Sequence, residues 1–211
     1  FALLVNAHYR TTPNDFRYML DGPNLQIFTL KQNNQLIAAS LVAYEGGLDT
    51  DLNEAIWQGR RRPRGHLFPQ SLMAHAGFKE AGEFSYARVI RIAVHPELQH
   101  KGLGSLLLEK LEDVMRDKKL DFLCTSFGAS ESLLRFWRKN GFSMARLGVK
   151  AEASTGEYAA MKMKPLSEQL TSHCYMINNR FFRNLVVETE LQIRNNWVKE
   201  LFLNGSESEF T

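Results

Sequence analysis

The sequence is poor in cysteine and has no long apolar run. Its 211 residues include two cysteines, Cys124 and Cys174, whose spacing matches no metal-ligand motif. A reduced cytosolic setting is therefore the default. No stretch reaches the roughly 20 apolar residues of a membrane-spanning helix, and the N-terminal FALLVNA is too short for a signal peptide and lacks its basic flank. These absences predict a cytoplasmic protein with no membrane partner and no metal.

The charge is not strongly of one sign. Lys and Arg number 26 against 23 Asp and Glu, and the net charge of +3 does not by itself demand a nucleic-acid partner. The composition, 44% hydrophobic and 23% charged, is ordinary for a globular protein. The chain begins without Met in a strand-like stretch, so we expect it to be a piece of a longer protein.

Strand-like and helix-like segments alternate as far as residue 165, which predicts an α/β fold with a mixed sheet rather than a doubly wound one. Strands are expected at 1–7, 25–31, 35–44, 86–94, 120–127, 142–149 and 157–164. Helices are expected from Thr12 and at 51–59, 69–77, 103–118 and 130–141. The helix at 103–118 should bury Leu103, Leu106, Leu107, Leu111, Val114 and Met115. Residues 86–127 should form a right-handed parallel crossover. Residues 1–165 are the expected main domain, and 166–211 a helical segment.

A glycine turn, QHKGLGS at 99–105, joins the strand at 86–94 to the following helix. The first amides of a helix have no partner within it, and the helix dipole adds positive charge there. Gly102 and Gly104 would let a phosphate approach this backbone, with His100 and Lys101 at the rim. The spacing fits neither a Walker loop nor a dinucleotide fingerprint. A tight turn that binds nothing is the alternative.

The flanks of this turn carry a family resemblance. RIAVHPELQHKGLGSLLLEKLE resembles the acyl-CoA signature (Q/R)xxGx(G/A) of the GNAT N-acetyltransferase superfamily, and RFWRKNGF at 135–142 is similar to its second landmark. The resemblance implies a GNAT fold, a mainly antiparallel mixed sheet flanked by helices, and acetyl-CoA as cosubstrate. The implied cofactor contacts are Ile92, Ala93 and Val94 for pantetheine, the turn residues Gln99, His100, Lys101, Gly102, Leu103, Gly104 and Ser105 for the phosphates, and Ser132 and Lys139. A solvated lysine is the alternative at Lys139. The thioester would lie where strands 86–94 and 120–127 splay apart.

Three stretches narrow the resemblance: LLVNAHYRTTPNDFRYMLDGPN, WQGRRRPRGHLFPQSLMAHAGF and RVIRIAVHPELQHKGLGSLLLEKLE. Together they are similar to the bacterial tRNA(Met) cytidine acetyltransferase family and its eukaryotic relatives that acetylate rRNA and tRNA. The resemblance implies acetylation of the wobble cytidine of elongator tRNA-Met to N(4)-acetylcytidine, and it implies that residues 166–211 begin the family's tail domain. Family members carry an ATP-dependent helicase-like module ahead of the acetyltransferase. This chain has no Walker loop, so ATP and that module are expected only in the longer protein.

The implied reaction needs charge stabilisation at the thioester oxygen and removal of a proton from the amine. A backbone amide near Val94 is the candidate oxyanion donor, and His8 the candidate base, unless His8 and Arg10 only brace the next helix. Many superfamily members protonate the leaving thiolate with a tyrosine of the second-landmark helix. That position holds Phe136 and Trp137, which leaves the general acid open among Ser126, Ser130, Ser132 and other groups.

An arginine loop at 60–64 is the candidate RNA contact, together with Arg10. Arg60, Arg61, Arg62 and Arg64 cluster around Pro63, and the planar guanidinium fork binds phosphate well. A solvated loop is the alternative. The aromatics Tyr175, Phe181, Phe182, Trp197 and Phe202 suggest core, although Arg180, Arg183 and Arg194 keep a base-stacking role open. Two other functions are considered: acetylation of a protein or small amine, and a non-catalytic RNA-binding module.

Overall fold

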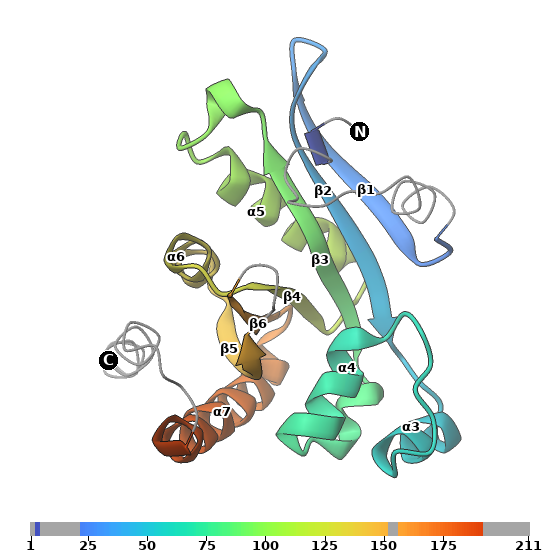
Figure 1. Cartoon of the computed structure of the whole chain (residues 1–211). Helices are drawn as coiled ribbons and strands as arrows, with labels where there is room; N and C mark the ends of the chain where they lie inside the picture. Colours follow the sequence, from blue (N-terminus) through green and yellow to red (C-terminus); the bar gives the residue numbers. More distant parts are fainter. Residues whose placement is uncertain (1–2, 5–21, 152–155, 192–211) are drawn as a thin grey trace.

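A computed structural model of the chain describes residues 3–4, 22–151 and 156–191. Its centre is a six-stranded sheet in the order β1-β2-β3-β4-β6-β5 (Figure 1). The β3–β4 pair is parallel and the other neighbours are antiparallel, which confirms the predicted mixed, mainly antiparallel sheet. The strands are β1 (Leu25–Gln32), β2 (Gln35–Gly46), β3 (Ser85–Val94), β4 (Phe122–Gly128), β5 (Ser143–Ala151) and β6 (Tyr158–Pro165).

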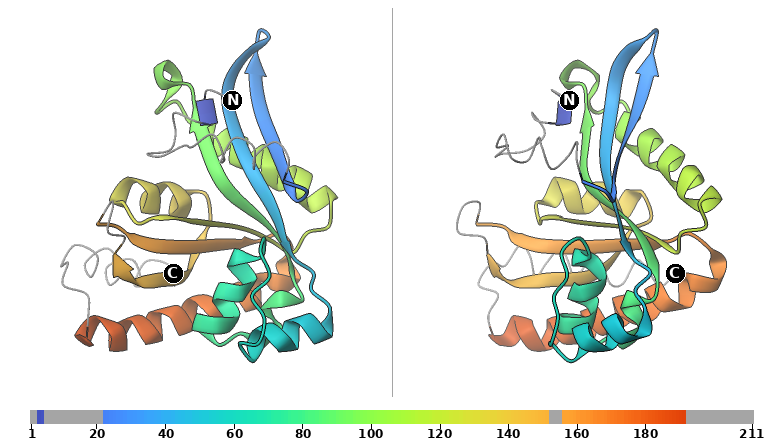
Figure 2. Two further views of the ribbon diagram at one scale, coloured as in Figure 1. Left: turned by 45° about the vertical axis from the view of Figure 1, so that its right-hand side comes forward. Right: turned by 90° about the vertical axis from the view of Figure 1, so that its right-hand side faces the viewer.

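The helices cover both faces of this sheet (Figure 2). The longer ones are α3 (Thr50–Trp57), α5 (Leu103–Asp117), α6 (Glu131–Lys139) and α7 (Thr171–Leu191); α4 (Leu67–Ser71) is one short turn that continues into a π-helical turn (Leu72–Ala76). Short 3-10 turns lie at Lys79–Gly82, Pro96–Leu98 and Glu168–Leu170. We call the side with α5 and α6 the α5 face, and the side with α3, α4, the π-helical turn and α7 the α7 face.

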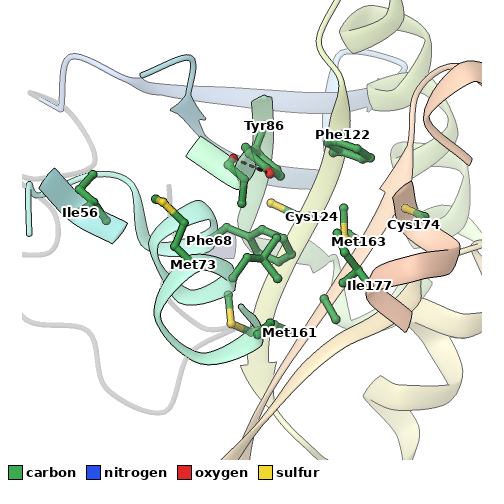
Figure 3. Close-up of a cluster of buried hydrophobic side chains, with 14 residues drawn as sticks. Ile56, Phe68, Met73, Tyr86, Phe122, Cys124, Met161, Met163, Cys174 and Ile177 are labelled. Atoms are coloured by element: carbon green, nitrogen blue, oxygen red, sulfur yellow. Dashed lines mark hydrogen bonds between the residues drawn. The ribbon is translucent and has the colours of Figure 1, made fainter. Parts of the chain in front are cut away.

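The core on the α7 face is aromatic and rich in sulfur (Figure 3). Phe68 of α4 contacts Tyr86 of β3 with ring centroids 5.5 Å apart, and the Tyr86 hydroxyl donates a hydrogen bond of 2.8 Å to the carbonyl of Ala81. Both cysteines belong to this core as free thiols. Burial raises the pKa of Cys174 to about 12 and that of Cys124 well above its ordinary value, so both thiols are neutral and unreactive near pH 7.

Helix α7 is packed onto this core rather than projecting from it. Cys174 and Ile177 join the cluster around Phe68, while Phe181 and Leu185 belong to a second cluster that includes side chains of β5. The aromatic segment is therefore partly core, although Tyr175 is 54% exposed. Trp197, Phe202 and Arg194 lie outside the described residues. That residues 166–211 begin a tail domain stays a prediction.

Two sequence predictions of the fold are wrong. Helix α5 buries Leu107, Leu108, Leu111 and Met115, whereas Leu106 and Val114 are 40% and 36% exposed. The inward face is thus turned from the predicted one, because the leucine-rich first half of α5 offers two adjacent apolar faces. In the expected first strand, the two described residues, Leu3 and Leu4, are helical. Leu4 is buried against Ala39, Leu41 and Ala93.

In the part of the chain that the structure describes, no helix combines the length and apolar character needed to cross a membrane.

Candidate functional site

Strands β3 and β4 diverge into a fork. Their parallel pairing runs from Tyr86 opposite Phe122 to Val89 opposite Thr125. At this last rung the buried Thr125 hydroxyl donates a 3.1 Å hydrogen bond to the carbonyl of Val89. Beyond it β3 continues to Val94 paired with β2, and β4 continues to Gly128 paired with β6. The predicted splay is therefore confirmed.

A register shift bends β3 where the fork opens. Leu41 faces Arg91 and its neighbour Val42 faces Val89, so Ile90 is an extra residue in β3. Past it the buried Ser40 hydroxyl donates a 3.1 Å hydrogen bond to the carbonyl of Arg91, which fixes the bent arm. Such bulges increase twist and redirect the backbone. The edge of β3 at Ile92, Ala93 and Val94 is consequently turned away from β4.

Glycine is needed at two positions of the turn at 99–105, for a different structural reason at each. Gly102 caps the N-terminus of α5 with φ of 81°, a left-handed conformation, and a Cβ there would meet nothing within 4 Å. Gly104 instead packs closely, since a Cβ there would lie 3.2 Å from Cε2 of Phe136 and 3.7 Å from Cγ2 of Val94. Gly102 thus leaves the cradle of amides open, and Gly104 brings α5 against α6 and the β3 arm.

The remaining predicted cofactor residues belong to this turn, to the β3 arm and to α6. Gln99, His100 and Lys101 are exposed, and Leu103 and Ser105 are half-buried in the first turn of α5. Gln99 Nε2 lies 3.5 Å from the carbonyl oxygen of Val94, the long limit of a hydrogen bond. Ser132 is exposed near the start of α6, with its hydroxyl 3.3 Å from that of Ser130. Ile92 packs toward the α5 face and Ala93 toward Leu4.

A cavity of about 400 Å³ continues from the turn between α5 and the C-terminal end of α6. It brings together Ser105 and Lys139, two predicted cofactor contacts that are far apart in sequence. Its other lining residues are Leu108, Glu109, Glu112, Asn140, Gly141, Phe142 and Lys164. Because Lys164 is paired with Glu112, Lys139 is the lining cation that suits a phosphate-bearing ligand.

Glu112 joins α5 to β6 at the floor of this cavity. Its carboxylate lies 2.5 Å from Lys164 Nζ and 2.6 Å from an Arg116 Nη. Burial alone would raise the pKa of Glu112, but the hydrogen bonds from Lys164 and Arg116 outweigh it and hold that pKa below 4.5. The carboxylate therefore stays ionised near pH 7 and pairs with both cations.

We expect Glu112→Gln to destabilise the fold near pH 7 by on the order of 1 kcal/mol, because the ion pairs are partly exposed. Since the folded pKa is below the unfolded value of 4.5, the contribution is fully present above that pH and disappears as pH falls through the folded pKa. Urea unfolding of both proteins at several pH values measures this. A difference that stays constant into acid would contradict the ionic origin.

A buried carboxylate on the α7 face fixes the arginine loop close to the fork. Glu45, 4% exposed, accepts hydrogen bonds from Arg88 Nε at 2.5 Å and from the backbone amide of Phe68 at 2.7 Å. The amide of Gly46 donates to His66 Nδ1 at 2.9 Å. Arg88 is one rung before the end of the β3–β4 pairing. The loop thus ends on residues anchored to the base of the fork.

The arginine loop begins equally firmly at α3, where the amides of Arg60 and Arg61 both donate to the carbonyl of Ala55. Arg60, Arg61, Arg62 and Arg64 are all exposed, so the loop presents four cations from a fixed backbone. The dense group of arginines seen in the sequence therefore lies on the surface of the α7 face.

Two side chains that the sequence analysis did not single out, His75 and Arg146, interact electrostatically with this loop. The pKa of His75, in the π-helical turn, is lowered first by burial and then by the charges of Arg146 in β5 and Arg62. At the next turn Arg180 of α7 lies over the ring of Phe78 and donates to the carbonyl of Gly77. These residues come from four separate elements. Only the fold brings them together, and no local motif could have indicated it.

We expect Arg62→Ala to raise the pKa of His75 toward 6.5, because one of the charges that disfavour its protonation is removed. NMR titration of the His75 ring measures the shift. Arg64→Ala, an exposed neighbour in the same loop, is the matched control and should leave the pKa of His75 in place. An equal pKa of His75 in the wild type and both variants would show that the arginine loop does not act on His75.

The candidate catalytic residues are only partly described. His8 and Arg10 lie outside the described residues, but Leu4, shortly before them, accepts a 3.3 Å hydrogen bond from Arg91 Nη1 on the β3 arm. Ser126 is half-buried on β4 just past the fork. Phe136 and Trp137 form an edge-to-face pair with ring centroids 5.3 Å apart, and neither carries an acidic proton. Within the described residues, no cluster of His, Cys, Asp and Glu suits a metal ion.

Comparison with known proteins provides independent evidence about the family of this chain. A family model described as GNAT acetyltransferase 2 matches residues 1–118 and 107–167. A protein of Nitrosococcus halophilus named tRNA(Met) cytidine acetyltransferase TmcA is 42% identical over 185 residues, which cover 88% of this chain and 25% of that protein. The protein of the same name from Salmonella typhimurium is 43% identical, covering 80% of this chain and 25% of its own length.

Solved structures show the same fold at low identity. The ribosomal-protein-S18-alanine N-acetyltransferase of Escherichia coli has a TM-score of 0.52 at 19% identity, covering 79% of this chain and 85% of its own. A GNAT family acetyltransferase of Elizabethkingia anophelis has a TM-score of 0.52 at 16% identity, with coverages of 78% and 88%. The predicted GNAT fold is confirmed. The chain spans about a quarter to a third of the length of the curated relatives that it matches.

Proposed function

This chain belongs to the GNAT acetyltransferase 2 family, and from that premise we propose that it transfers acetyl from acetyl-CoA to the exocyclic amine of cytidine in tRNA. The product is N(4)-acetylcytidine, and the wobble cytidine of elongator tRNA-Met is the substrate position. The observation that carries the proposal is the fork between β3 and β4, with the glycine turn beside one arm and the arginine loop anchored at its base. The names of the relatives support the substrate.

Acetyl-CoA fits the residues on the α5 face. The open backbone at Gly102 and the first amides of α5 suit a pyrophosphate, and Lys139 lines the adjoining cavity. The pantetheine arm would pair with the β3 edge at Ile92, Ala93 and Val94. This edge is not paired with β4, because the β3–β4 pairing ends at Val89. These contacts would place the thioester in the fork and the acceptor on the α7 face.

The proposed chemistry is acyl transfer. The N4 nitrogen of cytidine attacks the thioester carbonyl carbon, the carbon–sulfur bond breaks, the CoA thiolate leaves, and N4 loses one proton. A backbone amide near Val94 would stabilise the developing oxyanion. His8 is the proposed proton acceptor. The thiolate takes its proton from Ser126 or from water, because the aromatic pair of α6 has none to give.

The longer natural chain would supply what this one lacks. We propose a helicase-like module on the same polypeptide that uses ATP to present the tRNA, and a cytoplasmic location. The short share of each relative that this chain covers supports a larger protein.

The test is acetyl transfer from radiolabelled acetyl-CoA to total tRNA, total protein or polyamines, with this chain and with the longer chain plus ATP. Label in tRNA cytidine supports the proposal. Label in protein or polyamine with unlabelled tRNA overturns the substrate, and CoA binding without any transfer overturns catalysis.

A further inference from the structure

A carboxylate covers the end of β4 at the mouth of the fork. Gly128 is the last residue of β4, and a Cβ at that position would lie 2.0 Å from Oε2 of Glu157 and 3.4 Å from its Cβ. The end of the Glu157 side chain thus occupies the space that a Cβ at position 128 would need, and a larger residue there would displace the carboxylate. The backbone is fixed here as well, because the amide of Ala129 donates a 2.8 Å hydrogen bond to the carbonyl of Tyr158.

This carboxylate is on the α7 face. Successive side chains of a strand point to opposite faces, and Phe122 and Cys124 of β4 belong to the core on the α7 face. Gly128 is in the same alternating row and pairs with Ala159, as Ser126 pairs with Met161 and Cys124 with Met163. The glycine turn and its cavity lie on the other face, with α5 and α6. An acceptor must therefore reach the fork from the side of Glu157.

We propose, on the basis of the proposed function, that Glu157 contacts the acceptor cytidine and accepts a hydrogen bond from its exocyclic amine. An ionised carboxylate accepts hydrogen bonds and donates none, and carboxylates pair with the N4 amine of cytosine. A uracil offers an acceptor at the same place and would be repelled. The contact uses one N–H of the amine and so turns the nitrogen toward the thioester. Glu157 thereby selects cytidine and orients it.

Gly128 provides a way to displace this carboxylate without removing it. Gly128→Ala places a methyl group where Oε2 lies, so the Glu157 side chain must move. Gly148→Ala, in β5 on the other side of β6, is the matched control, since its Cβ would make only ordinary contacts of 3.5 Å with Ala159.

The experiment measures kcat/KM for acetylation of tRNA in whichever chain gives transfer in the assay above. Glu157→Ala and Gly128→Ala should each lower it on the order of 10- to 100-fold, and the double variant should be no worse than Glu157→Ala. Gly148→Ala should match the wild type. Acetyl-CoA affinity, followed by calorimetry, should be unchanged in all of them.

Full activity of Glu157→Ala overturns the inference, as does additive loss in the double variant, which would mean that Gly128→Ala acts otherwise than through the carboxylate. If Gly128→Ala fails to fold, Glu157→Ala and Glu157→Gln still decide the matter, because they shorten or neutralise a side chain that precedes β6. A wild-type chain that labels protein instead of tRNA refutes the proposed function and is distinguished from these outcomes.

Discussion

Replacement of Gly104 by Glu is expected to abolish measurable binding of acetyl-CoA. The new side chain starts 3.2 Å from the Phe136 ring, so it cannot lie between α5 and α6 and must turn toward the cradle of amides. There its carboxylate faces the phosphates of the ligand, and opposed like charges cost several kcal/mol, which is about 100-fold or more in affinity. Isothermal titration calorimetry with acetyl-CoA measures the loss.

The matched control is Gly104→Gln, which has nearly the same size and no charge. It should bind more weakly than the wild type and more strongly than the Glu variant, the gap being the electrostatic part. Folding should survive in both, because Glu and Gln both have a higher helix propensity than Gly; circular dichroism checks this. Unchanged affinity in the Glu variant would remove the glycine turn from the cofactor site.

Local patterns were sufficient for the elements near the turn. The strand predicted at 86–94, the helix predicted from Leu103 and the helix predicted at 130–141 all lie, within a few residues, where the sequence patterns placed them. The same patterns failed for the orientation of α5, because two adjacent faces of this helix are equally apolar. Leu106 and Leu108 are both leucines in α5, and only packing against the sheet decides that Leu108 is buried and Leu106 exposed.

Features made by long-range contacts were out of reach of the sequence. His75 and Arg146 are in separate motifs, and neither belongs to an arginine-rich stretch. Their association with Arg62 depends on how the π-helical turn and β5 pack on one face. Glu157 likewise becomes a candidate contact residue only because β4–β6 pairing places Gly128 beside it. In the sequence alone, a glycine at the end of a strand indicates only that a turn follows.

Simultaneous replacement of Arg60, Arg61, Arg62 and Arg64 by alanine is expected to weaken tRNA binding strongly and to flatten its salt dependence. Each arginine that pairs with a phosphate releases counterions, so the slope of log K against log salt should fall by about one for each such arginine that is replaced. Removal of all four guanidinium groups would reduce affinity by orders of magnitude at low salt. Acetyl-CoA affinity should persist, because the glycine turn is on the opposite face.

The control must separate local contact from total charge. Alanine at four exposed residues of β1, α5 and its C-cap, and α6 removes four positive charges elsewhere: Lys31, Lys110, Lys118 and Arg138. Fluorescence anisotropy with labelled tRNA at several salt concentrations should give that variant a slope near the wild-type value. The loop is held before Arg62 by amides that donate to the Ala55 carbonyl and after Arg64 by the Phe68 amide, which donates to the Glu45 carboxylate. None of these bonds uses an arginine side chain, so the four side chains can be removed without breaking them. Equal slopes in both quadruple variants would assign the arginine loop to ordinary solvated surface.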